Sequence, residues 1–195
     1  MHAQLAFRLK PRRLGRFVRG TLLTAATLTL ALGSNAAWQP ASGPLLTRWA
    51  KDVSPGKAHP EYPRPQMVRR DWLNLNGLWD YAIAERTAPQ PTRWDGQILV
   101  PFPIESALSG VMKPVNEKQR LWYRRTFQVP GAWKKRHVLL HFGAVDWEAQ
   151  VWVNGKEIGF HRGGYDGFGF DITPALKPAD DQEIVVAVWD PTDAG

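Results

Sequence analysis

The chain of 195 residues contains no cysteine. This absence excludes disulfide bonds, thiolate metal ligands and a cysteine nucleophile. The sequence also has no heptad pattern, no internal repeat and no low-complexity tract. Tryptophan, in contrast, is abundant, and all ten Trp residues fall between Trp38 and Trp189 beside many Val, Ile, Leu and Phe residues. A segment of this composition and length can build a hydrophobic core without disulfide bonds.

The first 36 residues have a composition of their own. They carry six basic and no acidic residues, and residues 21–33 (TLLTAATLTLALG) form an uncharged, mostly apolar run before Ser34-Asn35-Ala36. A basic start, a short apolar run and a small-residue exit predict a secretory signal peptide, and hence an exported protein of the periplasm or the extracellular space. The alternative is a membrane anchor, but a helix of about 13 residues rises only ~20 Å, against ~30 Å of hydrocarbon. Lipid attachment after the run is excluded because no cysteine follows.

The net charge changes once this leader is set aside. The whole chain has 25 Lys and Arg against 18 Asp and Glu, which gives +7 and a pI near 9.9. Without the six basic residues of 1–36, 19 basic residues face 18 acidic ones, a net charge of +1. Nucleic-acid binding would need clustered basic charge on the domain itself. We therefore expect no nucleic-acid partner.

The remaining chain divides into two parts. Residues 37–66 are rich in proline, which breaks helices and central strands, and we expect them to form an extended arm laid on the domain that follows. The alternative for this part is complete disorder. Residues 67–195 are predicted to form one β-domain, because from about residue 72 short apolar runs alternate with turn residues. The predicted strands are residues 78–84, 97–102, 121–129, 137–145, 147–153 and 183–189.

Local signals give this domain its expected detail. Asn154-Gly155 between two apolar runs predicts a β-hairpin turn with positive φ. Residues 183–189 are apolar on both faces and are expected to form a central strand. Thr173-Pro174 suits a single helical turn with Thr173 as its N-cap. The predicted architecture is all-β, an antiparallel β-sandwich of the jelly-roll type.

Five stretches together carry a resemblance to a known family. The N-terminal sugar-binding domain of family 2 glycoside hydrolases, the family of β-galactosidases and β-glucuronidases, is similar to about residues 62–193. The stretches are LNLNGLWDY (73–81), VPFPIESALSG (100–110), LWYRRTFQVP (121–130), HFGAVDWEAQVWVNGKEIGFHRGGYDGFGFDIT (141–173) and VVAVWDPTD (185–193). The resemblance implies a galactose-binding-domain-like sandwich that is truncated at its C-terminus. In the family, an immunoglobulin-like domain and a barrel follow the sandwich.

The resemblance also implies a chemistry. Family members hydrolyse β-glycosides with retention, using two glutamates on a (β/α)₈ barrel. The resemblance carries neither glutamate onto this sequence, so we expect a non-catalytic fragment of a glycosidase with β-glycoside carbohydrate as its partner in the full enzyme. No cofactor or metal is expected, since the sequence has no metal-ligand spacing and no phosphate-binding glycine loop. The alternative function is a free-standing carbohydrate-binding module.

Three residues are candidates for contact with a sugar. Asn116 falls where the resemblance to some β-galactosidases implies a sugar-contacting asparagine. Trp122 and Trp152 have flat indole faces that suit pyranose rings, although a Trp in such a sandwich also serves core or inter-domain packing.

Other polar residues are expected to have structural roles. His161 and Asp171 bracket a loop that an imidazole–carboxylate pair between them would pin, and Gly163 and Gly164 permit a left-handed backbone within it. The adjacent Arg124-Arg125 alternate across a strand, so one is expected to be exposed and the other paired with a carboxylate.

Overall fold

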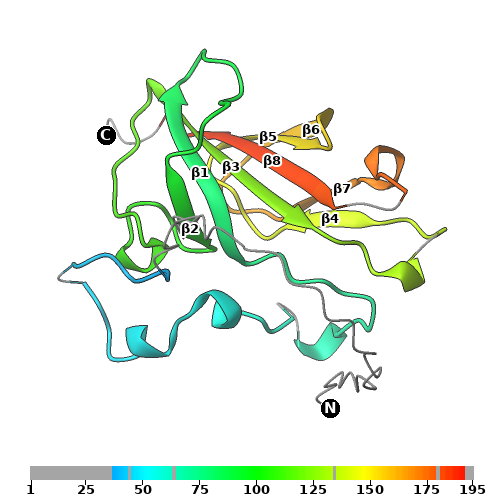
Figure 1. Cartoon of the computed structure of the whole chain (residues 1–195), viewed down its shortest axis with the longest axis horizontal. Coiled ribbons are helices and arrows are strands. Elements are labelled where there is room, and N and C mark those ends of the chain that lie inside the picture. The colour runs from blue at the N-terminus through cyan, green and yellow to red at the C-terminus, as the bar shows by residue number, and fades with distance from the viewer. Residues whose placement is uncertain (1–36, 44, 63–64, 134, 179–180, 192–195) are drawn as a thin grey trace, which may run out of the picture. The chain divides into compact units, whose positions relative to one another are not determined.

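The computed structural model describes residues 37–43, 45–62, 65–133, 135–178 and 181–191. The predicted signal peptide, residues 1–36, lies outside these ranges. The described part is all-β, and its only helices are 3₁₀ helices of three residues each (Figure 1): η1 (Ala50–Asp52), η2 (Pro55–Lys57), η3 (Pro65–Met67), η4 (Ala107–Ser109), η5 (Gly131–Trp133) and η6 (Thr173–Ala175). No helix of this part is long and apolar enough to span a membrane.

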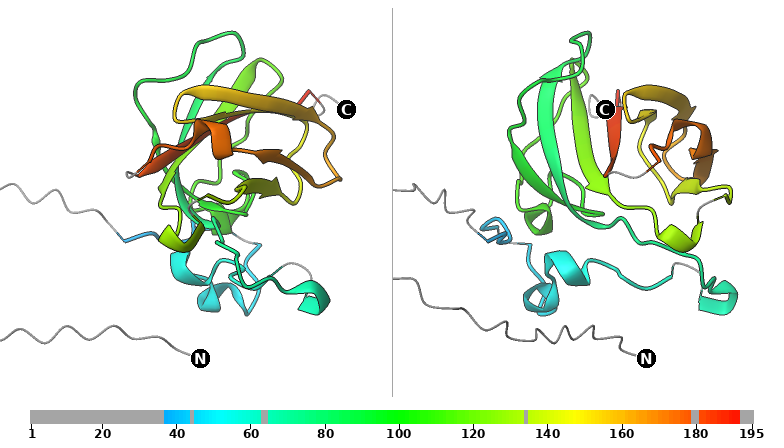
Figure 2. Two further views of the ribbon diagram at one scale, coloured as in Figure 1. Left: turned by 90° about the vertical axis from the view of Figure 1, so that its right-hand side faces the viewer. Right: turned by 45° about the vertical axis from the view of Figure 1, so that its right-hand side comes forward.

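Eight strands form two antiparallel sheets in the described part. The larger sheet has the order β2-β1-β3-β8-β5-β6 and the smaller pairs β4 with β7. Figures 1 and 2 show the smaller sheet beside one face of the larger one. The strands are β1 (Gly77–Glu85), β2 (Gly96–Val100), β3 (Gln119–Phe127), β4 (Leu139–Phe142), β5 (Glu148–Val153), β6 (Lys156–Arg162), β7 (Phe168–Asp171) and β8 (Gln182–Trp189).

The core lies between the two sheets. Every second residue of the larger sheet points into it, and the side chains of Ile98, Val151 and Ile184 are completely buried there. The smaller sheet contributes Leu140 and three phenylalanines that pack against the same cluster, which are Phe142, Phe168 and Phe170. Full burial of a Val, Leu, Ile or Phe side chain stabilises a fold by about 1.5–3 kcal/mol. Burial of these alternate positions is therefore what holds the sandwich together.

Most of the predicted strands are present, and the predicted central strand is β8, which lies between β3 and β5. The hairpin prediction is confirmed, because Asn154 (φ 52°) and Gly155 (φ 78°) join β5 to β6. The strand predicted at 137–145 is shorter in the structure, where only β4 (Leu139–Phe142) forms. Strand β7 was not predicted, because Gly169 interrupts its apolar residues and its partners on β4 lie 26 to 32 residues away in the sequence.

The prediction that Thr173 caps a helical turn is wrong. Helix η6 begins at Thr173, and Ile172 occupies the N-cap position. The Thr173 hydroxyl instead accepts a hydrogen bond of 2.8 Å from the backbone N–H of Val138, which ties η6 to the segment before β4.

The proline-rich arm lies against the domain. The backbone N–H of Ala41 donates to the carbonyl of Ala107 over 2.8 Å, and the indole N–H of Trp38 donates to the carbonyl of Ser109. Further along, the ring of Tyr62 meets that of Trp72 at 4.7 Å. The arm is not continuously extended, since η1, η2 and η3 interrupt it. These contacts fix it to the connection between β2 and β3 and to the segment before β1.

Candidate functional site

The face of the larger sheet that points away from the core is unusually apolar along its middle. A half-solvated antiparallel sheet normally places polar side chains on its free face. Here the outward positions of β1, β3, β8 and β5 include a strip of apolar residues, namely Ala82, Trp122, Val185, Ala187 and Trp152. We call the side of the larger sheet that bears this strip the outer face.

Two of the predicted sugar-contacting residues meet in this strip. The rings of Trp122 and Trp152 stack with their centroids 5.5 Å apart and their planes at 25°. Trp122 is only 3% exposed, and its indole N–H has no hydrogen-bond partner within the described ranges. Trp152 remains partly exposed. On the outer face, Trp122 is therefore covered by its neighbours, whereas part of Trp152 is open to solvent.

A polar cleft adjoins the strip on its β2 side. Cross-strand pairing aligns Gln97, Asp80 and Arg124 in one row over β2, β1 and β3. The Nε and Nη2 atoms of Arg124 both donate to Oδ2 of Asp80, over 3.0 and 2.6 Å. The guanidinium also lies 4.7 Å from the ring centre of Trp94. The cleft has a volume of about 330 Å³ and is lined by Leu78, Asp80, Gln97, Arg124, Arg125 and Thr126.

The two adjacent arginines are both engaged, so the prediction that one of them is exposed is wrong. Arg125 does not pair with a carboxylate. Its Nη1 donates to the carbonyls of Leu75 (2.6 Å) and Asn76 (2.8 Å). Partial burial lowers the pKa of Arg125, because desolvation disfavours the charged guanidinium. It is Arg124 that pairs with a carboxylate, and Arg125 anchors the segment that leads into β1.

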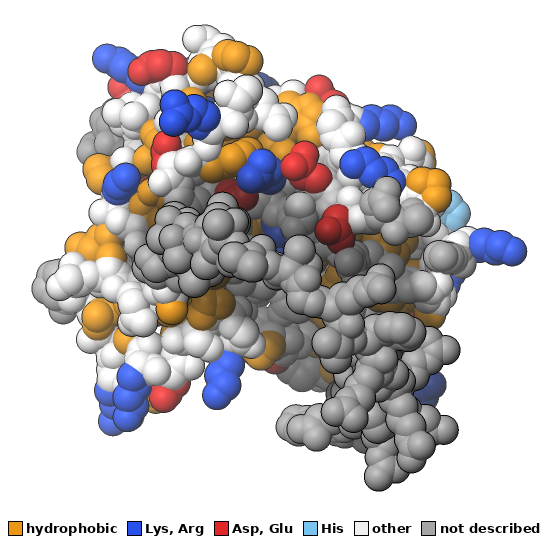
Figure 3. Space-filling view, viewed as in Figure 1, with side chains coloured by type: hydrophobic (Ala, Val, Ile, Leu, Met, Phe, Trp, Pro, Cys, Tyr) orange, Lys and Arg blue, Asp and Glu red, His pale blue; other side chains and the backbone are white. Residues whose placement is uncertain are grey.

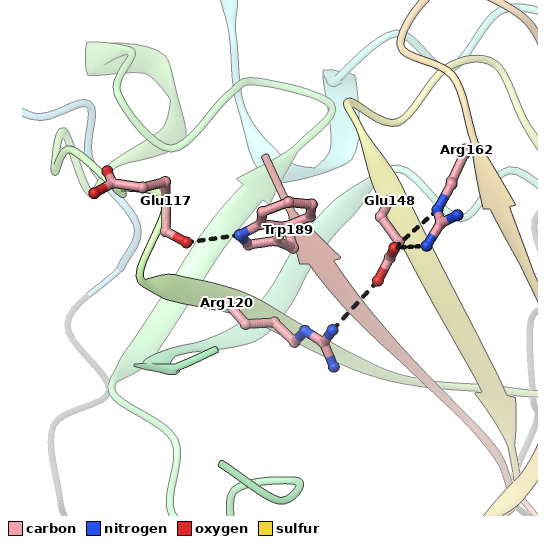
Figure 4. A network of polar contacts seen from close by, with 5 residues as sticks. All are labelled: Glu117, Arg120, Glu148, Arg162 and Trp189. Carbon is pink, nitrogen blue, oxygen red and sulfur yellow. Dashed lines mark hydrogen bonds and ion pairs between the residues drawn. The ribbon is translucent and has the colours of Figure 1, made fainter. Parts of the chain in front are cut away.

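An ionic cluster occupies the other end of the outer face (Figure 4). Glu148 accepts two hydrogen bonds from Arg162, over 3.0 and 2.9 Å, and one of 3.4 Å from Arg120. Glu148 and Arg120 are only 16% and 17% exposed, so this pair is largely shielded from water. Beside them the indole N–H of Trp189 donates to the carbonyl of Glu117 over 2.7 Å. The bond attaches the end of β8 to the loop that precedes β3.

Asn116 lies in that same loop. It is exposed, its Oδ1 accepts from the N–H of Lys118 (3.0 Å), and its own N–H donates to the side chain of Gln119 (3.2 Å). Within the described ranges no hydrogen bond or ring contact joins Asn116 to Trp122 or Trp152. Asn116 therefore lies at the strand-end margin of the outer face, apart from the tryptophan pair.

The loop predicted to be pinned by a His161–Asp171 pair is held in a different way. Asp171 lies at the end of β7, where it pairs with His137 (2.7 Å) and accepts from the N–H of Thr173 (2.9 Å). The hydrogen bonds from Thr173 and His137 lower the pKa of Asp171 to about 2. The predicted pair is wrong because β7 runs antiparallel to β4, which places Asp171 opposite Leu139 and next to His137.

His161 belongs to β6, where it lies opposite the core residue Ala149, so its side chain points to the core side of the sheet. Its ring stacks on Phe168 at 4.1 Å, and its Nε2 lies 3.4 Å from a carboxylate oxygen of Asp166. Gly163 has a φ of 141°, and a side chain at Gly164 would collide with the carboxylate of Asp146. Both glycines thus allow the loop to fold tightly against its neighbours.

The described part holds no group of metal ligands, and the face seen in Figure 3 shows no basic patch. No three His, Asp or Glu side chains lie close enough there to hold a metal ion. On the face seen in Figure 3, Lys and Arg side chains are scattered among acidic and apolar ones.

The fold and this surface define a class of protein. It is an antiparallel β-sandwich with aromatic and planar polar side chains on one sheet face, an arrangement suited to carbohydrate. Residues 72–194 match the family described as glycosyl hydrolases family 2, sugar binding domain, and the chain belongs to this family.

Known relatives are β-glycosidases. A β-galactosidase of Thermoanaerobacter pseudethanolicus is 39% identical over 125 residues, which cover 62% of this chain and 17% of that protein. A β-glucuronidase of Paenibacillus borealis is 26% identical over 133 residues, 65% of this chain and 22% of the relative. The solved β-glucuronidase of Faecalibacterium prausnitzii is 29% identical with a TM-score of 0.49, covering 60% of this chain and 20% of that one. The chain thus spans about a fifth of the length of these relatives.

Proposed function

We propose that the chain is the non-catalytic sugar-binding and scaffolding domain of an exported retaining β-glycosidase, similar to β-galactosidases or β-glucuronidases. The observation that carries this proposal is the family match over residues 72–194. The complete enzyme would hydrolyse O-glycosyl bonds in carbohydrate metabolism, and the sandwich would have the jelly-roll, galactose-binding-like topology. Its partners would be an immunoglobulin-like domain and a catalytic barrel in a longer chain, together with a β-glycoside.

The chemistry of the outer face supports a recognition role over a catalytic one. Retaining hydrolysis uses two carboxyl groups ~5–5.5 Å apart, one as nucleophile and one as acid/base. Asp80 and Glu148 both lie on the outer face, but each is held by arginine. They also lie at opposite ends of it, on either side of the tryptophan strip. A carboxylate held by a guanidinium is fixed in place and orients its neighbours, which suits the shaping of a surface.

Two features are the proposed links to the sugar in the complete enzyme. Asn116 is exposed in the loop that Trp189 attaches to the end of β8, and Trp152 keeps part of its indole open to solvent. We assign Trp122 a supporting role beneath Trp152, because it is almost fully buried.

Hydrolysis of nitrophenyl β-galactoside and nitrophenyl β-glucuronide tests the function. The purified chain should hydrolyse neither substrate, whereas a product extended through the downstream reading frame should hydrolyse one of them. The anomer released by the extended product, followed by NMR, should be the β-anomer first. Turnover by the purified chain itself, surviving repeated purification, would overturn the non-catalytic assignment. An extended product that is inactive on both substrates would overturn the assignment to a β-galactosidase-like or β-glucuronidase-like enzyme.

Export is tested separately. The gene is expressed in a bacterial host, and the protein recovered outside the cytoplasm is sequenced from its N-terminus. We expect the mature protein to begin just after Ala36. Full-length protein retained in the cytoplasm would contradict the proposed export.

A further inference from the structure

We propose that the polar cleft on the outer face, formed by Asp80, Gln97, Arg124 and Thr126 with Trp94 at its side, binds a neutral β-linked oligosaccharide. This inference rests on the proposed function, because it gives the sugar-binding role of the domain a particular surface.

The position of the cleft follows from strand register. Asp80 of β1 lies opposite Gln97 of β2 on one side and opposite Arg124 of β3 on the other. Thr126 follows Arg124 by two residues, so its side chain emerges on the same face of the sheet. Four hydrogen-bonding side chains from three adjacent strands therefore converge on one cleft. Because they stand on paired strands rather than on a loop, their spacing is fixed by the sheet.

The Asp80–Arg124 pair offers both an acceptor and a donor to the hydroxyl groups of a sugar. Both donors of Arg124 that reach Asp80 bind the same oxygen, Oδ2. Within the described ranges, Oδ1 of Asp80 and Nη1 of Arg124 make no hydrogen bond, which leaves one acceptor and one donor for a ligand. Hydroxyl groups of an oligosaccharide can donate to the first and accept from the second. Charge-assisted hydrogen bonds of this kind are stronger than those between neutral groups.

The charge of the cleft favours a neutral sugar over an acidic one. The carboxylate of Asp80 neutralises Arg124 through direct contact. Arg125, the other cation in the lining, follows Arg124 by one residue on β3, so its side chain emerges on the opposite face of the sheet, where its Nη1 binds backbone carbonyls. A uronate would bring a second negative charge near Asp80 without a cation left to receive it. The pair therefore selects hydroxyl groups, which need no compensating charge.

The rest of the lining fits the same ligand. The side chains of Gln97 and Thr126 are exposed and make no hydrogen bond with any other described residue. They can therefore bind a ligand without breaking an internal contact. The volume of about 330 Å³ lies at the small end of the ~300–1,000 Å³ range of ligand sites, which suits one or two sugar rings. Trp94, held in place by the guanidinium of Arg124, adds an aromatic surface beside the polar groups.

NMR titration of the chain with cellotetraose and with β-1,4-galactotetraose tests the proposal, with digalacturonate as the acidic comparison. We expect saturable shifts of the Gln97 side-chain amide and the Arg124 Nε–H with at least one neutral oligosaccharide, and weaker binding of digalacturonate. Each of Gln97→Ala and Thr126→Ala should weaken binding about three- to tenfold, the worth of one hydrogen bond. Gln66→Ala, an exposed glutamine of the arm, is the matched control and should leave the affinity unchanged.

Two results would overturn the inference. One is the absence of shifts at Gln97 and Arg124 with both neutral oligosaccharides, and the other is preferential binding of digalacturonate. The assay involves no hydrolysis, so it is independent of the test of the proposed function. If the extended enzyme is inactive but the cleft binds oligosaccharide, only the proposed function is refuted. If the enzyme is active but the cleft shows no binding, only the inference about the cleft is refuted.

Discussion

Replacement of Asn154 should reveal how strongly one turn side chain holds the last strand in place. Asn154 has a φ of 52°, and its Nδ2 donates to the carbonyl of Ala175 (2.8 Å) and to the side chain of Gln182 (2.7 Å). Its Oδ1 accepts from the N–H of Glu183 over 2.9 Å. The side chain thus links the β5–β6 hairpin to the start of β8 and to η6.

The magnitude follows from these contacts. A hydrogen bond within a protein contributes about 0.5–1.5 kcal/mol net, so the loss of three lowers the free energy of unfolding by about 1.5–4.5 kcal/mol. Asn154→Gly keeps the positive φ at no steric cost and should show this loss alone. Asn154→Ala adds a left-handed backbone penalty of about 1–2 kcal/mol. For a chain of this size, a loss near 3 kcal/mol lowers Tm by roughly 6–12 °C.

Urea denaturation and thermal melting of the purified variants measure these effects. Asn116→Ala is the control, because Asn116 is exposed and its side chain makes one local hydrogen bond, so its loss should cost less than about 1 kcal/mol. The order of stability should be wild type, then Asn154→Gly, then Asn154→Ala. If Asn154→Gly melts with the wild type, the side-chain bonds contribute nothing and the asparagine serves only the turn conformation.

Substitutions at other positions also have defined outcomes. Asp171→Asn should remove a pH dependence of stability. The native pKa of Asp171, about 2, lies below the ordinary 3.8, so its carboxylate stabilises the fold above pH 3.8 and loses this effect as the pH falls through 2. In an acid titration, the stability of the variant should therefore change less with pH between these values than that of the wild type. Glu148→Ala leaves a largely buried arginine unpaired and should lower the free energy of unfolding by about 3 kcal/mol, whereas Arg162→Ala, at an exposed cation, should cost less than about 1 kcal/mol in urea titrations. Trp122→Ala should destabilise the chain by about 3–5 kcal/mol in the same assay, and a smaller effect than that of Trp152→Ala would show that Trp122 does not underlie the strip.

The β-architecture was predictable because its signals are local. Alternating apolar residues define the face of each strand, and Asn154-Gly155 specifies a hairpin from two residues alone. Strand β8 was recognisable as central because apolar residues occupy both of its faces. Strand β7 had no such signal, since Phe168-Gly169-Phe170 becomes a strand only when β4 pairs with it.

The side-chain partners were harder to predict, because they depend on strand order. The pairing of Asp171 with His137 requires β7 to lie beside β4, and neither residue is near the other in sequence. The role of Arg125 depends on the segment before β1, whose carbonyls are about 50 residues away. Trp122 and Trp152 were identified as individual aromatics, but their stacking requires β8 to separate β3 from β5. Arg120 and Arg124 lie two positions from Trp122 on β3, and this spacing alone could have predicted that they share its face of the sheet.

The apolar strip gives the polar groups at its two ends an environment that a solvated sheet would not provide. Asp80 with Arg124 lies at one end and Glu148 with its two arginines at the other, and the stacked tryptophans fill the space between. Exclusion of water from the strip lowers the local dielectric constant, which strengthens both ion pairs and holds their planar groups in fixed orientations. A sugar binds by many weak hydrogen bonds, each of which is effective only if its partner is already oriented. The strip therefore orients the polar groups of the cleft without contacting the ligand itself. Loss of the tryptophan pair should weaken carbohydrate binding even in variants that remain folded.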